Sequence, residues 1–391
     1  MLAHSPPLPL TIDYWDDTDI TAEDEKAVIL ALQQRDRVRC IRFCISVLKL
    51  QKVIPATDGE YPILEYLILS DPSKDKRIIL FLPETLQTPH LRHLAVDCSI
   101  PIRFPLLGTA AGLVTLHLAL YDPPTYFQPT VLLQSLSSMP QLKILSIFFC
   151  FAVPNRVVER QLMRTPIRVM THVTLPNLRS FSFGAVNAYS EAVLSRFTAP
   201  HLEDFRICYF KQLTFSVPQL LQFIERTEIL KFDRAEFLFL SERVYVAVNP
   251  SDTNMPVDAF SMSIACLHLD WQVSSVAQIF NALSQIFSAV EHLTLSYKAH
   301  SRSSEENNEV DRTEWRKLLK SFSGVKTLQI DDGLVRELSR CLRLDNGEHP
   351  LELLPELQEL TYSGSGNAND EFAPFIDARR NAGRPVTLIN S

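Results

Sequence analysis

The sequence has little glycine and no recognisable motif for catalysis or nucleotide binding. Only 10 of its 391 residues are glycine, whereas loops that cradle phosphates need several glycines at fixed spacing. The Gly-x-Ser-x-Gly motif of hydrolases, the His-Glu-x-x-His motif of metalloproteases and paired-cysteine metal motifs are all missing. We therefore expect a protein that is not an enzyme and that uses no cofactor or metal.

Positive charge is also scarce. The chain has 38 Lys and Arg against 45 Asp and Glu, which gives a formal net charge of −7. Binding to nucleic acid needs a basic face that neutralises phosphates, and no cluster of Lys and Arg along the sequence would build one. We expect neither a nucleic-acid partner nor a polybasic membrane attachment.

Long apolar runs and targeting signals are missing as well. The longest nearly apolar stretch, 144–153, has about ten residues, whereas a membrane-spanning helix needs roughly 20. Residues 1–10 lack the basic leader of a signal peptide and contain prolines. The seven cysteines form no Cys-x-x-Cys and are odd in number, which is typical of a reducing compartment. We expect an intracellular protein, in the cytoplasm or the nucleus.

What the sequence does contain is one short motif that recurs twelve times. The motif is an apolar residue, two free positions, an apolar residue, one free position and an apolar residue. The middle apolar residues of the twelve copies are Ile41, Leu67, Leu94, Leu116, Leu145, Phe181, Phe205, Leu230, Leu267, Leu293, Leu328 and Leu360. The mean step between them is about 29 residues, and leucine-rich repeats are 20–29 residues long.

This period predicts an α/β fold, a leucine-rich-repeat solenoid in the form of an arc. Parallel strands would line its concave face, and helices and irregular turns would cover its convex face, because each copy buries its apolar side only by stacking on its neighbours. We expect one continuous domain with an N-terminal capping strand and helix at 1–37, twelve irregular repeats at 38–363 and a C-terminal capping helix and strand at 364–391.

The segments between the motifs add detail to this prediction. Start signals and amphipathic patterns predict helices over 21–33, 216–224, 274–287 and 313–322. Polar composition predicts flexible loops at 301–311 and 245–254. We expect Trp15, Trp271 and Trp315 to pack against the protein rather than to stack on a ligand, and the acidic segment 13–25 to be a solvated cap rather than a metal site.

The free positions of the motif give the candidate binding residues. Positions are counted from the first apolar residue of each copy. The third and fifth positions, and the seventh, which directly follows the motif, should point away from the core, onto the concave face. The resulting candidates are Tyr66, Ile68, His93, His117, Ile144, Phe148, Asp204, Arg206, Lys231, Asp233, His268, Asp270, His292, Gln329 and Asp331. The early copies are more apolar than the later ones, and exposed apolar groups favour contact with a protein. Alternatively, the tail or long loops fold over them.

Three of these candidates raise the question of a metal site. His268, Asp270 and His292 fall on two neighbouring copies, and parallel strands lie about 4.8 Å apart. Imidazole and carboxylate groups are also ordinary surface residues, and no fourth ligand is evident. We therefore favour a polar sheet surface at this place.

Several segments resemble a known family. They are Leu175–Phe181, Ala199–Phe205 and Leu354–Leu360 among the repeats, the ending Phe375–Leu388 and the beginning Leu8–Asp13. Together they resemble the leucine-rich-repeat region of the F-box-like proteins of mushroom-forming fungi, over essentially the whole chain. The resemblance implies a receptor whose repeats hold the substrate of a cullin-type ubiquitin ligase.

The F-box itself, which docks on the cullin adaptor in that family, has no counterpart in the sequence. Its Leu-Pro-x-Glu opening and Cys-x-x-Trp ending are absent, and Leu82–Thr85 has only a superficial likeness. A cullin adaptor is expected as a partner only if an F-box lies outside this chain. The alternative is a stand-alone repeat protein, truncated or F-box-less, with no role in ubiquitin transfer. In either case we expect a monomer that binds an unknown protein on its concave face.

Overall fold

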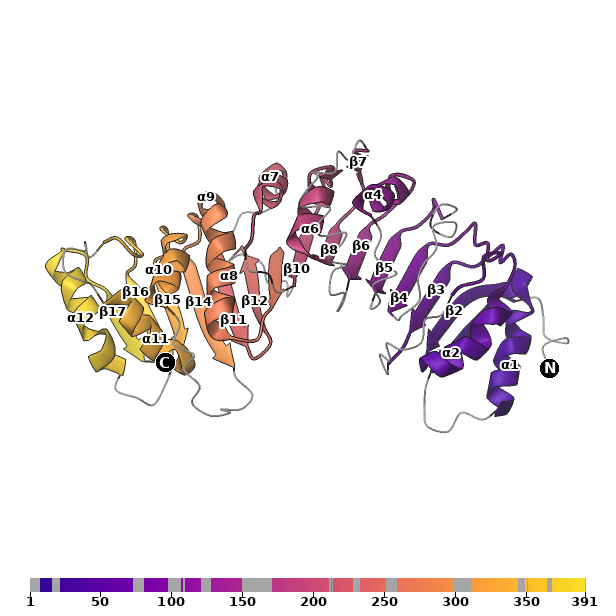
Figure 1. The fold of residues 1–391 in the computed structure, drawn as a ribbon, viewed down its shortest axis with the longest axis horizontal. Coiled ribbons are helices and arrows are strands. Elements are labelled where there is room, and N and C mark those ends of the chain that lie inside the picture. The colour runs from indigo at the N-terminus through magenta and orange to yellow at the C-terminus, as the bar shows by residue number, and fades with distance from the viewer. Residues whose placement is uncertain are drawn as a thin grey trace. The chain divides into compact units, whose positions relative to one another are not determined.

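The computed structural model describes residues 8–15, 22–72, 81–97, 107, 110–120, 128–149, 171–210, 212, 214–227, 233–250, 259–298, 311–343, 349, 351–363 and 368–390. The chain divides into two compact units, Met1–Leu202 and Glu203–Ser391. Each unit is built on a mostly parallel sheet accompanied by helices (Figure 1).

The N-terminal unit has a parallel sheet whose strands follow one another in chain order. The strands are β1 (Leu10–Trp15), β2 (Val38–Cys44), β3 (Tyr66–Ser70), β4 (His93–Asp97), β5 (Thr115–Leu120), β6 (Ile144–Phe149) and β8 (Ser180–Ala185). A separate pair joins β7 (Val173–Thr174) to β9 (Phe197–Thr198). The helices are α1 (Ala22–Leu32), α2 (Val47–Val53), α4 (Pro129–Ser137) and α6 (Asn187–Leu194), with 3-10 turns η2 (Arg35–Arg37) and η3 (Ile54–Thr57).

The recurring motif sets the register of this sheet. Its middle apolar residues pair with one another from strand to strand and form one buried row of Ile41, Leu67, Leu94, Leu116, Leu145 and Phe181, which Ile12 of β1 extends. The rings of Phe183 and Phe149, from the next two inward rows, contact Tyr189 of α6 at centroid distances of 5.8 and 5.2 Å. The motif positions predicted to point inward therefore form the core between strands and helices.

The C-terminal unit has a mixed sheet. Its spatial order is β10 (Asp204–Tyr209), β13 (Phe260–Ala265), β12 (Arg243–Asn249), β11 (Arg234–Leu240), β14 (His292–Lys298), β15 (Thr327–Asp331), β16 (Glu359–Ser363) and β17 (Thr387–Asn390). The helices are α7 (Pro218–Arg226), α8 (Leu269–Ala282), α9 (Ser284–Phe287), α10 (Arg312–Lys320), α11 (Asp332–Leu342) and α12 (Ala368–Asn381).

A β-hairpin interrupts the parallel order here, so the prediction of parallel strands throughout is wrong for this unit. Strand β12 runs antiparallel to both β11 and β13. The expected loop at 245–254 is wrong as far as Asn249, which ends β12, and residues 251–254 lie outside the described ranges. These residues form strands because their apolar side chains recur at every second position. Buried and more exposed residues alternate along β11, and on β12 the buried residues include Val244, Val246 and Val248. A period of two favours a strand over a loop.

One repeat was also placed in the wrong frame. The motif copy centred on Leu267 was expected to be a strand, but β13 ends at Ala265 and α8 begins at Leu269. The strand buries Phe260, Met262 and Ile264, whereas Leu267 is 61% exposed. The copy centred on Leu230 lies outside the described residues, as does the expected loop at 301–311 except for Asp311.

The predicted helices are present, with ends shifted by a few residues. The Asp311 carboxylate begins α10 by accepting a hydrogen bond from the Thr313 backbone N–H at 2.9 Å, as an N-cap does. Trp315 of α10 is fully buried against Phe239, as predicted. Trp15 and Trp271 are more than two-fifths exposed.

Inward side chains of the C-terminal sheet meet the helices in the same way as those of the N-terminal one. Phe237 packs on Phe280 of α8 and Phe205 on Phe223 of α7, at centroid distances of 5.1 and 5.0 Å. Helix α11 contacts β14, β15 and β16. In the part of the chain that the structure describes, no helix is long and apolar enough to cross a membrane, and Cys40, Cys44, Cys208, Cys266 and Cys341 are free thiols.

Candidate functional site

Each sheet has a second face, formed by the strand side chains that alternate with the buried rows and point away from the helices. We call it the open face. On β3, β4 and β14 these alternate side chains are half-buried, whereas their inward neighbours are buried. The predicted candidates on these strands therefore have the predicted orientation.

On the open face of the N-terminal unit, Tyr66 and His93 form a stacked pair. Their rings lie in register on β3 and β4, with centroids 4.4 Å apart and planes 5° from parallel. The next strand continues the row, since His93 Nδ1 lies 3.2 Å from Thr115 Oγ1. Burial and the nearby positive charge of Arg92 both lower the pKa of His93, and the Glu65 carboxylate only partly opposes this.

A second histidine lies one strand further along. His117 Nδ1 is 2.8 Å from Ser146 Oγ, and its ring centroid is 6.5 Å from that of Phe148 on β6. Burial lowers the pKa of His117, and the carboxylate of Asp97 acts weakly in the opposite direction. Both histidines are therefore neutral near pH 7 and add flat, weakly polar surface rather than charge.

Apolar side chains complete this surface. Ile144 of β6 is 45% exposed, and Ile68 and Phe148 are half-buried. Trp15 at the end of β1 is 55% exposed, and its indole N–H donates to Asp13. Arg42 Nη1 lies 3.7 Å from the Asp13 carboxylate, so these two charges are paired. Exposed aromatic and aliphatic groups bounded by paired charges are typical of surfaces that bind proteins.

The candidates of the C-terminal unit form a polar surface. His292 Nδ1 lies 2.7 Å from Thr327 Oγ1, and Gln329 is exposed on the same sheet. Arg206 donates to Asp204 at 3.2 Å. The prediction that Asp204 is exposed is wrong, because this residue is buried at the start of β10.

Three other candidates do not lie on a strand. His268 and Asp270 stand at the start of α8, where the His268 ring meets Trp271 edge-on at 4.7 Å. The prediction that they lie on the open face of a strand is therefore wrong, because β13 ends at Ala265, before both residues. Asp233 precedes β11, and Lys231 lies outside the described residues.

The remaining candidate, Asp331, ends β15 and caps α11, where its carboxylate accepts a hydrogen bond from Gly333 N–H. Because His268 and Asp270 are not on the strand, the fold does not create the convergence with His292 that would form a metal site. Among the described residues, no group of three His, Cys, Asp or Glu side chains is placed to hold a metal ion.

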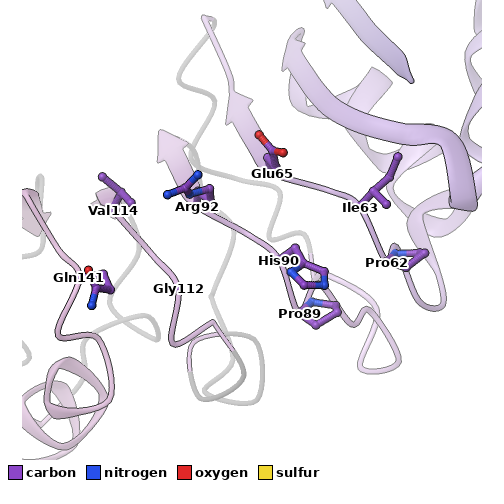
Figure 2. A pocket seen from close by; sticks show the side chains of 9 residues that line it. All are labelled: Pro62, Ile63, Glu65, Pro89, His90, Arg92, Gly112, Val114 and Gln141. Carbon is purple, nitrogen blue, oxygen red and sulfur yellow. The ribbon is translucent and has the colours of Figure 1, made fainter. Parts of the chain in front are cut away.

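The sequence interpretation missed a groove across the beginnings of β3 to β6. It has a volume of about 510 Å³ and is shown in Figure 2. Its apolar lining consists of Pro62, Ile63, Pro89 and Val114, and its polar lining of Glu65, His90, Arg92 and Gln141, with Gly112 between them. The first free position of the motif supplies Glu65, Arg92 and Val114, a position that was not considered as surface.

The comparisons with known proteins add no family. No protein-family model matches the chain, and no curated protein shows significant similarity to it. The function is therefore inferred from two surfaces, the open face and the groove.

Proposed function

We propose that this protein is a non-enzymatic interaction scaffold that binds another protein through the open face of its N-terminal unit. The observation that supports this most strongly is the continuous group of Tyr66, His93, His117, Ile144 and Phe148 across four neighbouring strands. The stacked rings of Tyr66 and His93, the imidazole of His117 and the apolar side chains of Ile144 and Phe148 offer apolar area with few unpaired charges, which is what protein interfaces bury at their centres.

We also propose that the fold is a leucine-rich-repeat solenoid. The support is that equivalent residues of successive motif copies pair in register, from Ile41 on β2 to Phe181 on β8. Stacked repeats need this arrangement, since each copy covers the apolar side of the next. Small-angle scattering from the full chain should give a longer profile than a globule of the same mass, and a compact profile would contradict the proposal.

The family resemblance suggests what kind of scaffold this is. A receptor related to F-box proteins would present a substrate protein to a cullin-type ubiquitin ligase, inside the cell, where free thiols such as Cys40 and Cys208 persist. The second candidate is a stand-alone interaction protein without a link to ubiquitin. The likeness of the repeats favours the first candidate, and recovery of a cullin adaptor separates the two.

Affinity purification tests the scaffold and separates the two candidates. The full chain is compared with Ile144→Ser, with Phe148→Ser and with Ile389→Ser as a matched control. Ile389 lies on β17 of the C-terminal unit and is 38% exposed, close to the 45% of Ile144. We expect one set of partners to be lost with both N-terminal variants and kept with the control.

The identity of the partners decides between the two candidates. Recovery of a cullin adaptor with the same chain would support the ligase receptor. Partners that are recovered without the adaptor would support the stand-alone scaffold. Partners that bind all four proteins equally would contradict the assignment of the open face.

A further inference from the structure

The groove at the beginnings of the strands belongs to a longer row of side chains. The residues at the first free position of successive motifs are linked by backbone hydrogen bonds from each N–H to the carbonyl of the preceding one, in the order Arg39, Glu65, Arg92, Val114, Lys143 and Arg179. Each bond is 2.8 or 2.9 Å long. The row therefore crosses the sheet at the beginnings of the strands, with one side chain for each strand.

This row is basic although the chain as a whole is acidic. It carries four cationic side chains and one carboxylate, whereas the formal net charge of the protein is −7. The residues are far apart in the sequence, so the earlier conclusion that no cluster of Lys and Arg exists is corrected by the fold. The fold concentrates positive charge along one edge of one sheet.

Two of these cations are available to a ligand. Arg39 Nη2 lies 2.9 Å from Glu65 Oε2, and this contact lowers the pKa of Glu65. Arg92 and Lys143, both exposed, have no side-chain hydrogen bond or ion pair to any described residue. They directly precede β4 and β6, two strand spacings apart, which is about 9.6 Å at roughly 4.8 Å per strand.

The apolar residue of the row, Val114, stands between the two cations. Pro62 and Pro89 line the groove further along, on the segments that lead into β3 and β4 (Figure 2). Prolines have a fixed φ and lose little entropy when a ligand orders them. The groove, together with Lys143 next to it in the row, thus offers two positive charges on either side of Val114, with stiff apolar surface on the side of Arg92.

We propose that this groove binds an acidic segment of a partner protein in the polyproline II conformation, with carboxylates three residues apart. In that conformation residues i and i+3 lie on the same side of the chain, and three residues at 3.1 Å each span about 9.3 Å. This distance matches the separation of about 9.6 Å between Arg92 and Lys143. The side chains between the two carboxylates lie over Val114.

A protein segment fits this groove better than a nucleic acid does. Nucleic-acid binding gains its strength from many neutralised phosphates, whereas the groove and the adjacent Lys143 offer two unpaired cations, with a carboxylate and apolar side chains beside them. A peptide with two carboxylates and apolar residues between them uses all of these features. The inference rests on the proposed scaffold function but concerns a different surface from the open face.

Fluorescence anisotropy with the full-length protein tests the inference. The probe is a labelled Pro-Glu-Pro-Pro-Glu-Pro peptide, whose carboxylates are three residues apart. The comparison peptides are Pro-Glu-Pro-Glu-Pro-Pro, with the carboxylates two residues apart, and a version with Lys in place of both Glu residues. We expect binding of the first peptide, at least about threefold weaker binding of the second and none of the third. Added salt should weaken binding, since the charges are exposed.

Variants locate the binding. Arg92→Glu and Lys143→Glu should each weaken it at least about tenfold, while Lys298→Glu, the same change at an exposed lysine of β14 in the other unit, should leave it unchanged. Equal binding of the three peptides, or equal effects of the three variants, would overturn the inference. Tighter binding of a single-stranded oligonucleotide at the same residues would overturn it in favour of a phosphate ligand.

One more variant separates this inference from the proposed function. Phe148→Ser lies on the open face and should leave peptide binding in the groove unchanged while it removes the protein partner. If Phe148→Ser removes the partner but the acidic peptide never binds, the scaffold stands and the groove inference fails. If the peptide binds and no open-face variant affects a partner, the open-face assignment fails and the groove remains.

Discussion

The two units share one way of packing a core but differ in what they expose. In both, the apolar residues of the motif pair in register, as Leu94 with Leu116 and Leu328 with Leu360. The row at the first free position is mostly basic in the N-terminal unit, whereas the row that is linked by the same backbone hydrogen bonds in the C-terminal unit holds Asp233, Glu291, Lys326 and Gln358. There, Lys326 Nζ is paired with Glu291 at 2.6 Å.

The open faces of the two units also differ in polarity. The N-terminal face has the stacked Tyr66 and His93 pair and the exposed Ile144, whereas the C-terminal face presents Gln329, Glu359 and threonines. Both units form the same core rows with different side chains at the free positions, so the fold does not require a particular side chain there. Residues there can vary without loss of the fold, so their clustering in one unit points to binding.

The largest effects should come from the shared core. Leu116→Asp and Leu328→Asp each place an unpaired carboxylate in a fully buried row, at a cost of about 4 kcal/mol or more. We expect the unit concerned to lose its thermal unfolding transition by circular dichroism. Leu→Met at the same positions should cost less than about 1.5 kcal/mol. If Leu116→Asp melts like the wild type, the inward assignment of this row is wrong.

A smaller effect should distinguish the C-terminal unit. Arg379 of α12 is fully buried, and its Nη2 donates to the carbonyls of Pro355 and Leu357, both at 3.0 Å. Arg379→Ala removes both donors and leaves a cavity, which should cost about 3 kcal/mol. Chemical denaturation measures this loss. Arg380→Ala, the neighbouring exposed arginine, is the control, and equal losses for the two variants would show that the buried contacts contribute nothing.

The stability of the N-terminal unit should depend on pH between 5 and 7 through His117. Burial lowers the pKa of His117, while in the unfolded chain a histidine titrates near about 6.5. As pH falls through that value, the unfolded chain takes up a proton that the folded protein does not, so stability falls. We expect melting temperatures at pH 5 and pH 7 to differ less in His117→Gln than in the wild type. An unchanged difference would contradict the burial of this imidazole.

The smallest effects should come from a pair of equivalent threonines. Thr115 Oγ1 lies 3.2 Å from His93 Nδ1, and Thr327 Oγ1 lies 2.7 Å from His292 Nδ1, at the same motif position in the two units. Each half-buried hydrogen bond should contribute about 0.5–1 kcal/mol, with the shorter one worth more. Denaturation of Thr115→Ala and Thr327→Ala checks this order, and a loss above about 2 kcal/mol would mean that either threonine supports the core.

The core of the fold could be predicted because it repeats. A buried row needs an apolar residue at each crossing, and the sequence shows that requirement directly at Ile41, Leu67 and Leu94. The frame of β13 could not be found in this way. The residues around Leu267 match the motif as well as those around Phe260 do, and only packing buries Phe260 and exposes Leu267.

The surfaces were harder to predict than the core. Tyr66, His93 and Phe148 were predicted from their spacing, since their positions alternate with buried ones. The groove was missed because its residues are separated by whole repeats. A signal was present in the sequence: Arg39, Arg92, Lys143 and Arg179 each follow the first apolar residue of a motif.

The most direct test of the account is side-chain oxidation by hydroxyl radicals, read by mass spectrometry, on the full chain with and without a partner obtained by affinity purification. The account predicts that binding protects Tyr66 and Phe148 on the N-terminal open face and leaves Trp271 of the C-terminal unit as reactive as before. Protection of Trp271 with no change at Tyr66 and Phe148 would contradict it.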